Sequence, residues 1–179
     1  MSSRPKAFFI NGGAGRVLCS IPAFEKYAEE NPDEDFIIVC EGGTELYKGH
    51  PILDAKSYDH WHKNLFKDKL KNIDVVSPEP YRVWEYYNQQ CSLAQAFDIE
   101  INNKGIRDLP IPSLFLSKEE EIAGINLINE VKENLKKEKV VVFQPFGRGI
   151  HQHGGILSDP SGRSFEYDSV IELIKKFQK

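Results

Sequence analysis

The sequence predicts an α/β protein built on a parallel β-sheet. Two short, nearly continuous apolar runs, KAFFI at 6–10 and DFIIVC at 35–40, are typical of strands buried on both faces. Between them the apolar residues recur with helical spacing, so the predicted order is strand, helix, strand. This order is typical of a Rossmann-like parallel sheet with helices on both faces.

The first strand leads into a glycine-rich turn, NGGAG at 11–15, and a helix is expected beyond it. We expect Ser20 to cap this helix, because Pro22 then falls in the first turn, where its missing N–H costs nothing. Asn31-Pro32 is expected to end the helix, because the residue before a proline avoids the helical conformation.

Shorter elements are expected between the second strand and residue 116. The second strand stops at Glu41, and the segment 56–62 stays open between strand and loop. The other expected elements are a short helix near 44–49, a helix near 63–70, a strand in 73–80, a helix over 84–97 and an extended segment at 109–116.

A long helix is expected to close a first domain at residues 1–136. Ser117 and Glu120 form a capping box at the start of this helix. Helical spacing predicts that one apolar face of the helix is buried, formed by Ile122, Ile125, Ile128, Val131 and Leu135.

Residues 137–179 are expected to hold a linker and one strand-loop-helix unit. VVVFQPFG at 140–147 predicts a strand, a glycine-rich loop follows over 147–163, and the last helix carries an apolar side. The unit repeats the order of elements at 6–30, which favours the beginning of a second Rossmann-like domain. A last strand of the first sheet explains the pattern equally well.

The composition argues against several classes of function. A net charge of −4 over 179 residues is unlike that of a general nucleic-acid binder. No run approaches the roughly 18 apolar residues of a membrane helix, and no secretory apolar segment opens the chain. The three cysteines form neither a CxxC zinc site nor an even disulfide set, so a reducing cytosol is the expected compartment.

The glycine turn lies where many α/β proteins bind a phosphate or a nucleotide. The dinucleotide fingerprint GxGxxG matches at Gly13 and Gly15, but Leu18 stands at its third glycine, and no P-loop string occurs. Two interpretations stay open: a purely structural turn, or a helix start that binds an anion or a sugar, with Gly12 to Arg16 facing a cleft.

A second candidate site is the loop after the expected strand at 140–147. It offers Gln144, Arg148, Arg163 and Ser164 near the end of that strand, where open α/β sheets bind ligands. Arg163 near a helix start would suit a diphosphate, because the guanidinium supplies charge and the helix end supplies N–H donors. A polar loop with incidental arginines is the alternative.

Two histidine pairs have the spacing of metal ligands on a strand. They are His60 with His62, and His151 with His153. No set of cysteines or carboxylates accompanies either pair in the sequence, so no metal site is expected.

Taken together, these features resemble glycosyltransferase family 9, the heptosyltransferase-like enzymes. Gly15-Arg16-Val17-Leu18 followed by Ile21-Pro22 is similar to the Gly-Asp-x-Leu and later proline of that family. Asn31-Pro32 before a strand, and His50-Pro51 before an aspartate, resemble the next steps of the family pattern.

The resemblance continues near the end of the chain. VVVFQPFG at 140–147 is similar to the strand that opens the C-terminal domain of the family. Arg163-Ser164-Phe165, followed by Ser169-Val170-Ile171, looks like its Lys-x-Trp-Pro and the helix after it.

The resemblance implies a GT-B architecture, in which an N-terminal Rossmann-like domain holds a glycan acceptor and a C-terminal one holds a nucleotide-sugar donor. It implies inverting, metal-independent transfer that needs no cofactor. Arg163, supported by Arg148, would bind the donor diphosphate. Arg16 would contact an anionic group of the acceptor or a donor phosphate.

Two departures from the family pattern favour an alternative. Arg16 stands at the position of the family's aspartate, and a protonated arginine cannot act as a general base. Glu41, at the end of the second strand, is the expected replacement base. Only one strand-loop-helix unit of a donor domain is present, so the alternative is an inactive fragment or a non-catalytic module that binds sugars or nucleotides.

Overall fold

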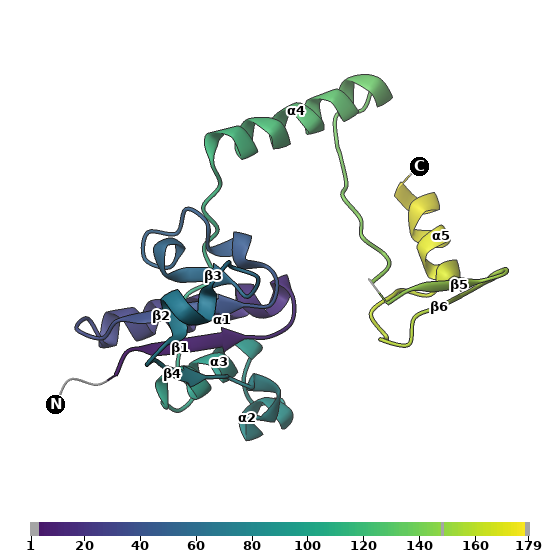
Figure 1. Cartoon of the computed structure of the whole chain (residues 1–179). Helices are drawn as coiled ribbons and strands as arrows, with labels where there is room; N and C mark the ends of the chain where they lie inside the picture. The colour runs from purple at the N-terminus through teal and green to yellow at the C-terminus, as the bar shows by residue number, and fades with distance from the viewer. Residues whose placement is uncertain (1–3, 148, 178–179) are drawn as a thin grey trace. The chain divides into compact units, whose positions relative to one another are not determined.

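The computed structural model describes residues 4–147 and 149–177, which fall into two compact units (Figure 1). Unit 1 ends at Ile122 and unit 2 begins at Ala123, so the boundary lies within helix α4 (Lys118–Leu135). The expected domain boundary, between 136 and 137, lies at the other end of the same helix.

Unit 1 is built on a four-stranded parallel sheet with the order β3-β2-β1-β4 (Figure 1). Phe8 of β1 pairs with Ile38 of β2 on one side and with Val76 of β4 on the other. The mixed α/β architecture, with helices flanking a parallel sheet, is confirmed and is compatible with a Rossmann-like fold. The strands are β1 (Lys6–Ile10), β2 (Phe36–Cys40), β3 (Ser57–Asp59) and β4 (Asp74–Val76).

The core of unit 1 lies between one face of this sheet and two helices, α1 (Ala14–Glu30) and α3 (Leu93–Asn102), which pack against each other. Aromatic rings dominate it: Phe8 of β1 meets Phe24 of α1 edge-on, with ring centroids 5.3 Å apart. Buried residues follow one another along the two central strands, as in Ala7-Phe8 of β1 and Ile38-Val39 of β2, so both faces of these strands are covered. The buried cluster includes Phe8, Ile10, Val17, Ile21, Phe24, Phe36, Ile38, Tyr47, Leu53 and Phe97.

Helix α1 begins earlier than the sequence predicts, so the prediction of a Ser20 cap is wrong. Its N-cap is Gly13, and Pro22 lies inside the helix. Ser20 is buried, and its hydroxyl donates to the carbonyl of Val17 and lies 2.7 Å from the hydroxyl of Tyr47. This contact across the core explains why Ser20 sits in mid-helix, where a local capping rule would not place it.

Several short elements connect the strands. The helix expected over 84–97 is two helices, α2 (Trp84–Tyr87) and α3, because the chain turns at Gln89, whose φ is 59°. Ser92 and Gln95 then form a capping box that starts α3. The other short elements are the 3₁₀ helices η1 (Thr44–Tyr47), η2 (Asp54–Lys56) and η4 (Pro80–Arg82), and a π-helical turn, η3 (Phe66–Leu70).

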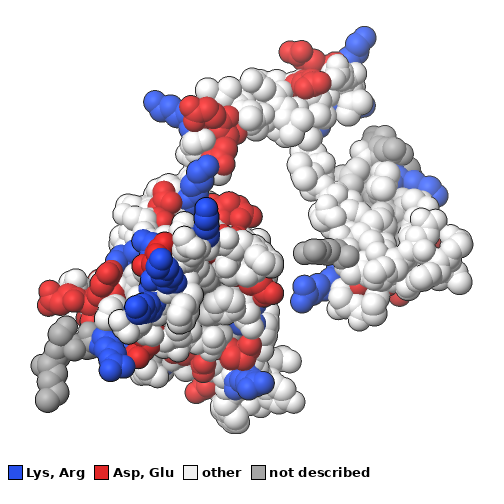
Figure 2. Space-filling model, in the orientation of Figure 1, with Lys and Arg blue, Asp and Glu red and all other residues white. Residues whose placement is uncertain are grey.

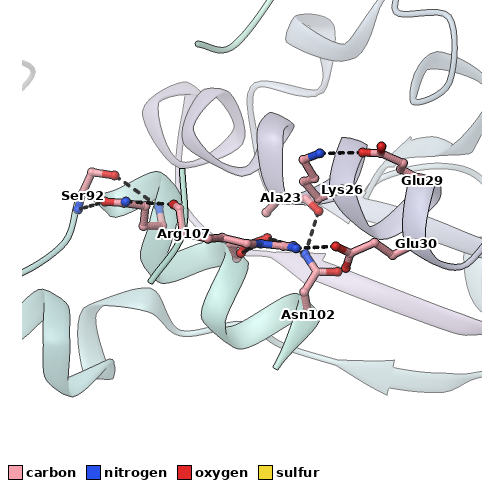
Figure 3. A network of polar contacts seen from close by, with 9 residues as sticks. Ala23, Lys26, Glu29, Glu30, Ser92, Asn102 and Arg107 are labelled. Atoms are coloured by element: carbon pink, nitrogen blue, oxygen red, sulfur yellow. Dashed lines mark hydrogen bonds and ion pairs between the residues drawn. The ribbon is translucent and has the colours of Figure 1, made fainter. Parts of the chain in front are cut away.

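A polar network fastens α3 to α1 (Figure 3). Asp98 is 1% exposed and accepts from Arg107 at both oxygens, with N···O distances of 2.5 and 2.8 Å. The same guanidinium pairs with Glu30 of α1, and the Asn102 amide donates to the carbonyl of Ala23 over 2.9 Å. The buried carboxylate is therefore fully paired, as burial of a charge requires.

Helix α4 does not bury its apolar face among the described residues, so that prediction is wrong. None of its residues is buried, and Ile125 is 59% exposed. In Figure 2 the stretch of α4 between its charged ends is largely white, which marks residues other than Lys, Arg, Asp and Glu. The capping box of Ser117 and Glu120 at its start is confirmed.

Unit 2 contains a two-stranded antiparallel hairpin and a helix. The strand expected at 140–147 is absent: that stretch forms no strand, and the hairpin follows it. The final helix is confirmed, and Val170 is its buried residue. The elements are β5 (His151–His153), β6 (Ile156–Ser158) and α5 (Tyr167–Phe177).

Candidate functional site

The candidate site of unit 1 lies where β1 and β4 end side by side. The strand order changes direction between them, and open α/β sheets bind ligands at such a point, beyond the carboxyl ends of the strands. Glycines shape this end of the sheet: Gly12 has φ of 86° and Gly43 has φ of 83°, a region that favours glycine. A Cβ at Gly43 would lie 2.6 Å from the Cα of Ala14, so the loop after β2 passes directly against the start of α1.

Glu41 and the glycine turn meet next to this point, where β1 and β2 end side by side. The backbone N–H of Gly12 donates to Glu41 over 2.6 Å, and both residues are exposed. Gly13 and Gly15 open the first turn of α1, and no side chain caps that end of the helix. In this first turn the N–H groups of Arg16 and Val17 donate to the carbonyl of Gly13, which leaves those of Ala14 and Gly15 as the candidate donors near the exposed carboxylate.

Arg16 does not face open solvent but closes the gap between α1 and the segment after β4. Its Nη1 lies 3.2 Å from Glu79, and its Nη2 donates to the carbonyl of Pro78 over 3.2 Å. The side chain is 11% exposed, and its guanidinium carbon lies 4.9 Å from the ring centre of Tyr81 and 5.6 Å from that of Phe97. Arg16 is therefore held by contacts within unit 1.

The charge of Glu79 is stabilised by this arrangement. Partial burial raises the pKa of its carboxyl, but the hydrogen bond and the charge of Arg16, with contributions from Tyr81 and Asn11, bring the pKa below its ordinary value. The site thus holds two carboxylates, of which Glu79 is neutralised by Arg16 and Glu41 accepts a backbone N–H.

An aromatic pocket that was not predicted from the sequence lies beside Arg16. Tyr81, Tyr86, Tyr87, Gln89 and Cys91 line an open cavity of about 510 Å³. Tyr81 and Tyr86 meet edge-on, with ring centroids 5.7 Å apart. The density of aromatic residues at 81–87 was the signal for this pocket in the sequence. It was not used, because the helical spacing of these residues suggested that they are buried.

The residues of unit 2 that were predicted to bind the nucleotide-sugar donor do not form one cluster among the described residues. Ser164 donates to Asp159 over 2.5 Å and accepts from the backbone N–H of Gly147, so it holds the loop closed. Gln144 donates to the carbonyl of Phe146, and Arg163 is exposed. Arg148 lies outside the described residues.

The loop of unit 2 is organised by a carboxylate. Hydrogen bonds from Ser161 and Ser164 lower the pKa of Asp159 to about 2. Asp159, Ser164 and Tyr167 help to line a cavity of about 200 Å³. Among the described residues, the charged groups that line it are Asp159 and Glu166, which are acidic and therefore opposite in sign to what a diphosphate requires.

The histidine pairs occupy different environments. His60 is partly buried, and its Nδ1 lies 3.3 Å from the carbonyl of Cys40. His151 and His153 share one face of the exposed strand β5, with ring centroids 6.5 Å apart. Within the described ranges, no three His, Cys, Asp or Glu side chains come together in a way that could hold a metal ion.

The comparisons with known proteins do not assign the chain to a family. No family model, no curated protein and no solved structure matches it. The resemblance to glycosyltransferase family 9 therefore stays a prediction. None of the described helices combines the length and the hydropathy that a membrane span requires.

Proposed function

We propose that this chain is a glycosyltransferase-like protein whose unit 1 binds an acceptor sugar at the carboxyl end of its sheet. The donor in this proposal is a nucleotide-activated sugar bound by unit 2, and the architecture is of the GT-B type. The resemblance at 15–22 and 140–171 supports this function, and so does the site at the end of β1.

The contact between Glu41 and Gly12 carries the proposal. A sugar hydroxyl both donates and accepts a hydrogen bond, so it is best bound where a carboxylate and backbone N–H groups lie together. Glu41 supplies the acceptor, and the uncapped first turn of α1 supplies donors, all within an exposed part of unit 1.

Glu41 is also the proposed general base. It would take the proton of the acceptor hydroxyl while that oxygen attacks the anomeric carbon of the donor. The bond between that carbon and the diphosphate oxygen breaks with inversion, and its electron pair leaves with the diphosphate. Arg16 has no part in this step, since Glu79 and Pro78 hold it and it stays protonated.

The alternative is a non-catalytic module that binds a sugar or a nucleotide. Two observations favour it: Arg16 replaces the family's aspartate, and Asp159 and Glu166 surround the cavity of unit 2, where a diphosphate was expected. Unit 1 would then bind a sugar through Glu41 without transferring it.

The test combines binding with turnover on the whole chain. Melting temperature and NMR shifts are measured with UDP-glucose, GDP-mannose, ADP-glucose, simple sugars and NAD⁺, and release of the nucleoside diphosphate is assayed. Glu41→Gln should abolish release and weaken sugar binding about tenfold, because a charge-assisted hydrogen bond is worth about 1.5–3 kcal/mol. Glu45→Gln, an exposed glutamate of η1, is the matched control.

The outcomes separate the two functions. Sugar binding that depends on Glu41, together with diphosphate release, supports the transferase. Sugar binding without release from any donor supports the module. Stabilisation by NAD⁺ alone, with no response to sugars, would overturn both.

A further inference from the structure

The pocket formed by Tyr81, Tyr86, Tyr87, Gln89 and Cys91 leaves aromatic surface uncovered. Tyr81 is 44% exposed and Tyr87 is 79% exposed, and Trp84, in the same short helix α2, is 64% exposed. None of the residues of α2 is buried, so these rings are not part of the core. Aromatic side chains gathered at an open cavity are typical of a binding surface.

The backbone beside the pocket is held in an unfavourable conformation. Gln89 has φ of 59°, although it is neither glycine nor asparagine. Its N–H donates to the carbonyl of Tyr86, and the N–H of Gln90 donates to the carbonyl of Glu85 over 2.8 Å. These two hydrogen bonds form the pattern that ends a helix at a left-handed residue, so the conformation of Gln89 terminates α2 and fixes this residue at the pocket.

The chemistry of the lining selects a neutral ring that bears hydroxyl groups. None of the described residues that line this pocket is charged, so the lining itself does not favour a phosphate or a carboxylate. The tyrosine ring faces carry negative potential and suit the C–H face of a pyranose. The phenol hydroxyls and the Gln89 amide donate and accept, as the hydroxyl rim of a sugar requires.

The pocket is joined to the Glu41 site through one side chain. The Arg16 guanidinium lies against the ring of Tyr81, and a Cβ at Gly12 would lie 3.0 Å from the Cδ of Arg16. Gly12 in turn donates to Glu41. One side chain, Arg16, which is 11% exposed, therefore contacts both the glycine turn at Glu41 and the tyrosine pocket.

We propose that the tyrosine pocket is a second sugar subsite, so that the acceptor is an oligosaccharide of at least two residues. This rests on the proposed function, in which Glu41 binds the sugar that receives the transfer. The first sugar lies at Glu41 and the second stacks on Tyr81 and Tyr87, with the Gln89 amide at its rim.

The test compares mono- and disaccharides on the full chain. Gluco-, galacto-, manno- and N-acetylglucosamine monomers and their dimers are titrated by NMR, together with adenosine, guanosine and uridine. Wild type should bind one of the dimers about tenfold more tightly than its monomer. Tyr87→Ala should remove that difference and leave the monomer affinity unchanged, because the monomer occupies the Glu41 subsite.

Two further variants make the outcomes distinct. Phe66→Ala removes an equally exposed aromatic ring of unit 1 outside the pocket and should change nothing. Glu41→Gln should weaken monomer and dimer alike. If Tyr87→Ala keeps the preference for the dimer, the second subsite is wrong while the proposed function stands. If only nucleosides bind and Tyr87→Ala abolishes that binding, the second subsite is overturned. If wild type binds no sugar at all, both the second subsite and the proposed function are overturned.

Discussion

Arg16 and Glu79, 63 positions apart in the sequence, form a partly buried ion pair with 3.2 Å between Nη1 and Oε1. The pair joins the start of α1 to the segment that follows β4, at the point where the strand order changes direction. Arg16 therefore maintains the shape of the site. The proposed binding surface consists of Glu41, the glycine turn and the tyrosines.

Arg16→Asp is expected to destabilise unit 1. The substitution places a second carboxylate beside Glu79 and removes the guanidinium from between Tyr81 and Phe97. Breaking this partly buried pair and placing two carboxylates together should cost about 1–3 kcal/mol. Urea unfolding followed by circular dichroism measures this loss. Glu79→Gln, which keeps a hydrogen-bond acceptor, should cost less; equal midpoints for Arg16→Asp and wild type would contradict the assignment.

Two glycines near the site should respond in opposite directions to alanine. Gly43→Ala forces a side chain into a positive φ and against the Cα of Ala14, so a loss of about 2–3 kcal/mol is expected. At Gly15, in the first turn of α1, nothing lies within 4 Å of an added Cβ. Gly15→Ala should therefore gain about 0.5–1 kcal/mol from helix propensity. Thermal unfolding of both variants measures the change in stability. A loss for Gly43→Ala only would show that the backbone conformation, and not the removal of a glycine as such, determines the change.

Arg107→Met should be among the most damaging single changes in unit 1. It leaves Asp98, which is 1% exposed, without its cation, at a cost of about 3–5 kcal/mol. Asp98→Asn added to Arg107→Met should recover part of this loss, because the uncompensated charge is removed. A double-mutant cycle measured by urea unfolding gives the coupling energy. If the effects of the Asp98 and Arg107 substitutions on the free energy of unfolding simply add, the ion pair between them does not contribute to stability.

The stability of unit 1 should fall in alkaline solution because of Cys40. Burial raises the pKa of this thiol from 9.0 to about 12, so the folded state keeps the proton that the unfolded chain releases. The contribution is complete below pH 9 and is lost between pH 9 and about 12, reaching at most about 4 kcal/mol.

Urea midpoints measured at pH 8, 9 and 10 check this expectation. Cys40→Ala should give a flatter profile over the same interval, since alanine has no proton to release. Tyr47, whose pKa burial also raises, contributes only above pH 10. Burial also raises the pKa of Cys19 and Cys91, so the difference between wild type and Cys40→Ala, and not the wild-type slope alone, reports Cys40. Identical slopes for the two proteins would assign the alkaline loss to another group.

The strands that are continuous apolar runs could be predicted from the sequence, and the candidate site could be predicted only in part. β1 and β2 are continuous apolar runs, and Glu41 follows from its position at the end of β2. The beginning of α1 was missed because Ser20 bonds to Tyr47 across the core instead of capping a helix. No local pattern could place Glu79 beside Arg16.

The C-terminal predictions fail for a related reason. A strand exists only where another strand pairs with it, and residues 140–147 find no partner among the described residues. The apolar spacing of α4 correctly predicts a helix, but burial of Ile125 depends on what packs against it. Periodicity thus identifies an element without identifying its neighbours.

Pro22, eight residues after the first residue of α1, has a consequence for how this end of the protein exchanges hydrogen with solvent. Because proline carries no N–H, the carbonyl of Leu18 receives no bond from position 22, and the helix ladder has a gap there. Val17 and Ile21 before this gap and Phe24 after it are all buried in the core of unit 1. We therefore expect packing of these side chains, and not an unbroken ladder of backbone hydrogen bonds, to set how slowly the amides of α1 exchange with solvent.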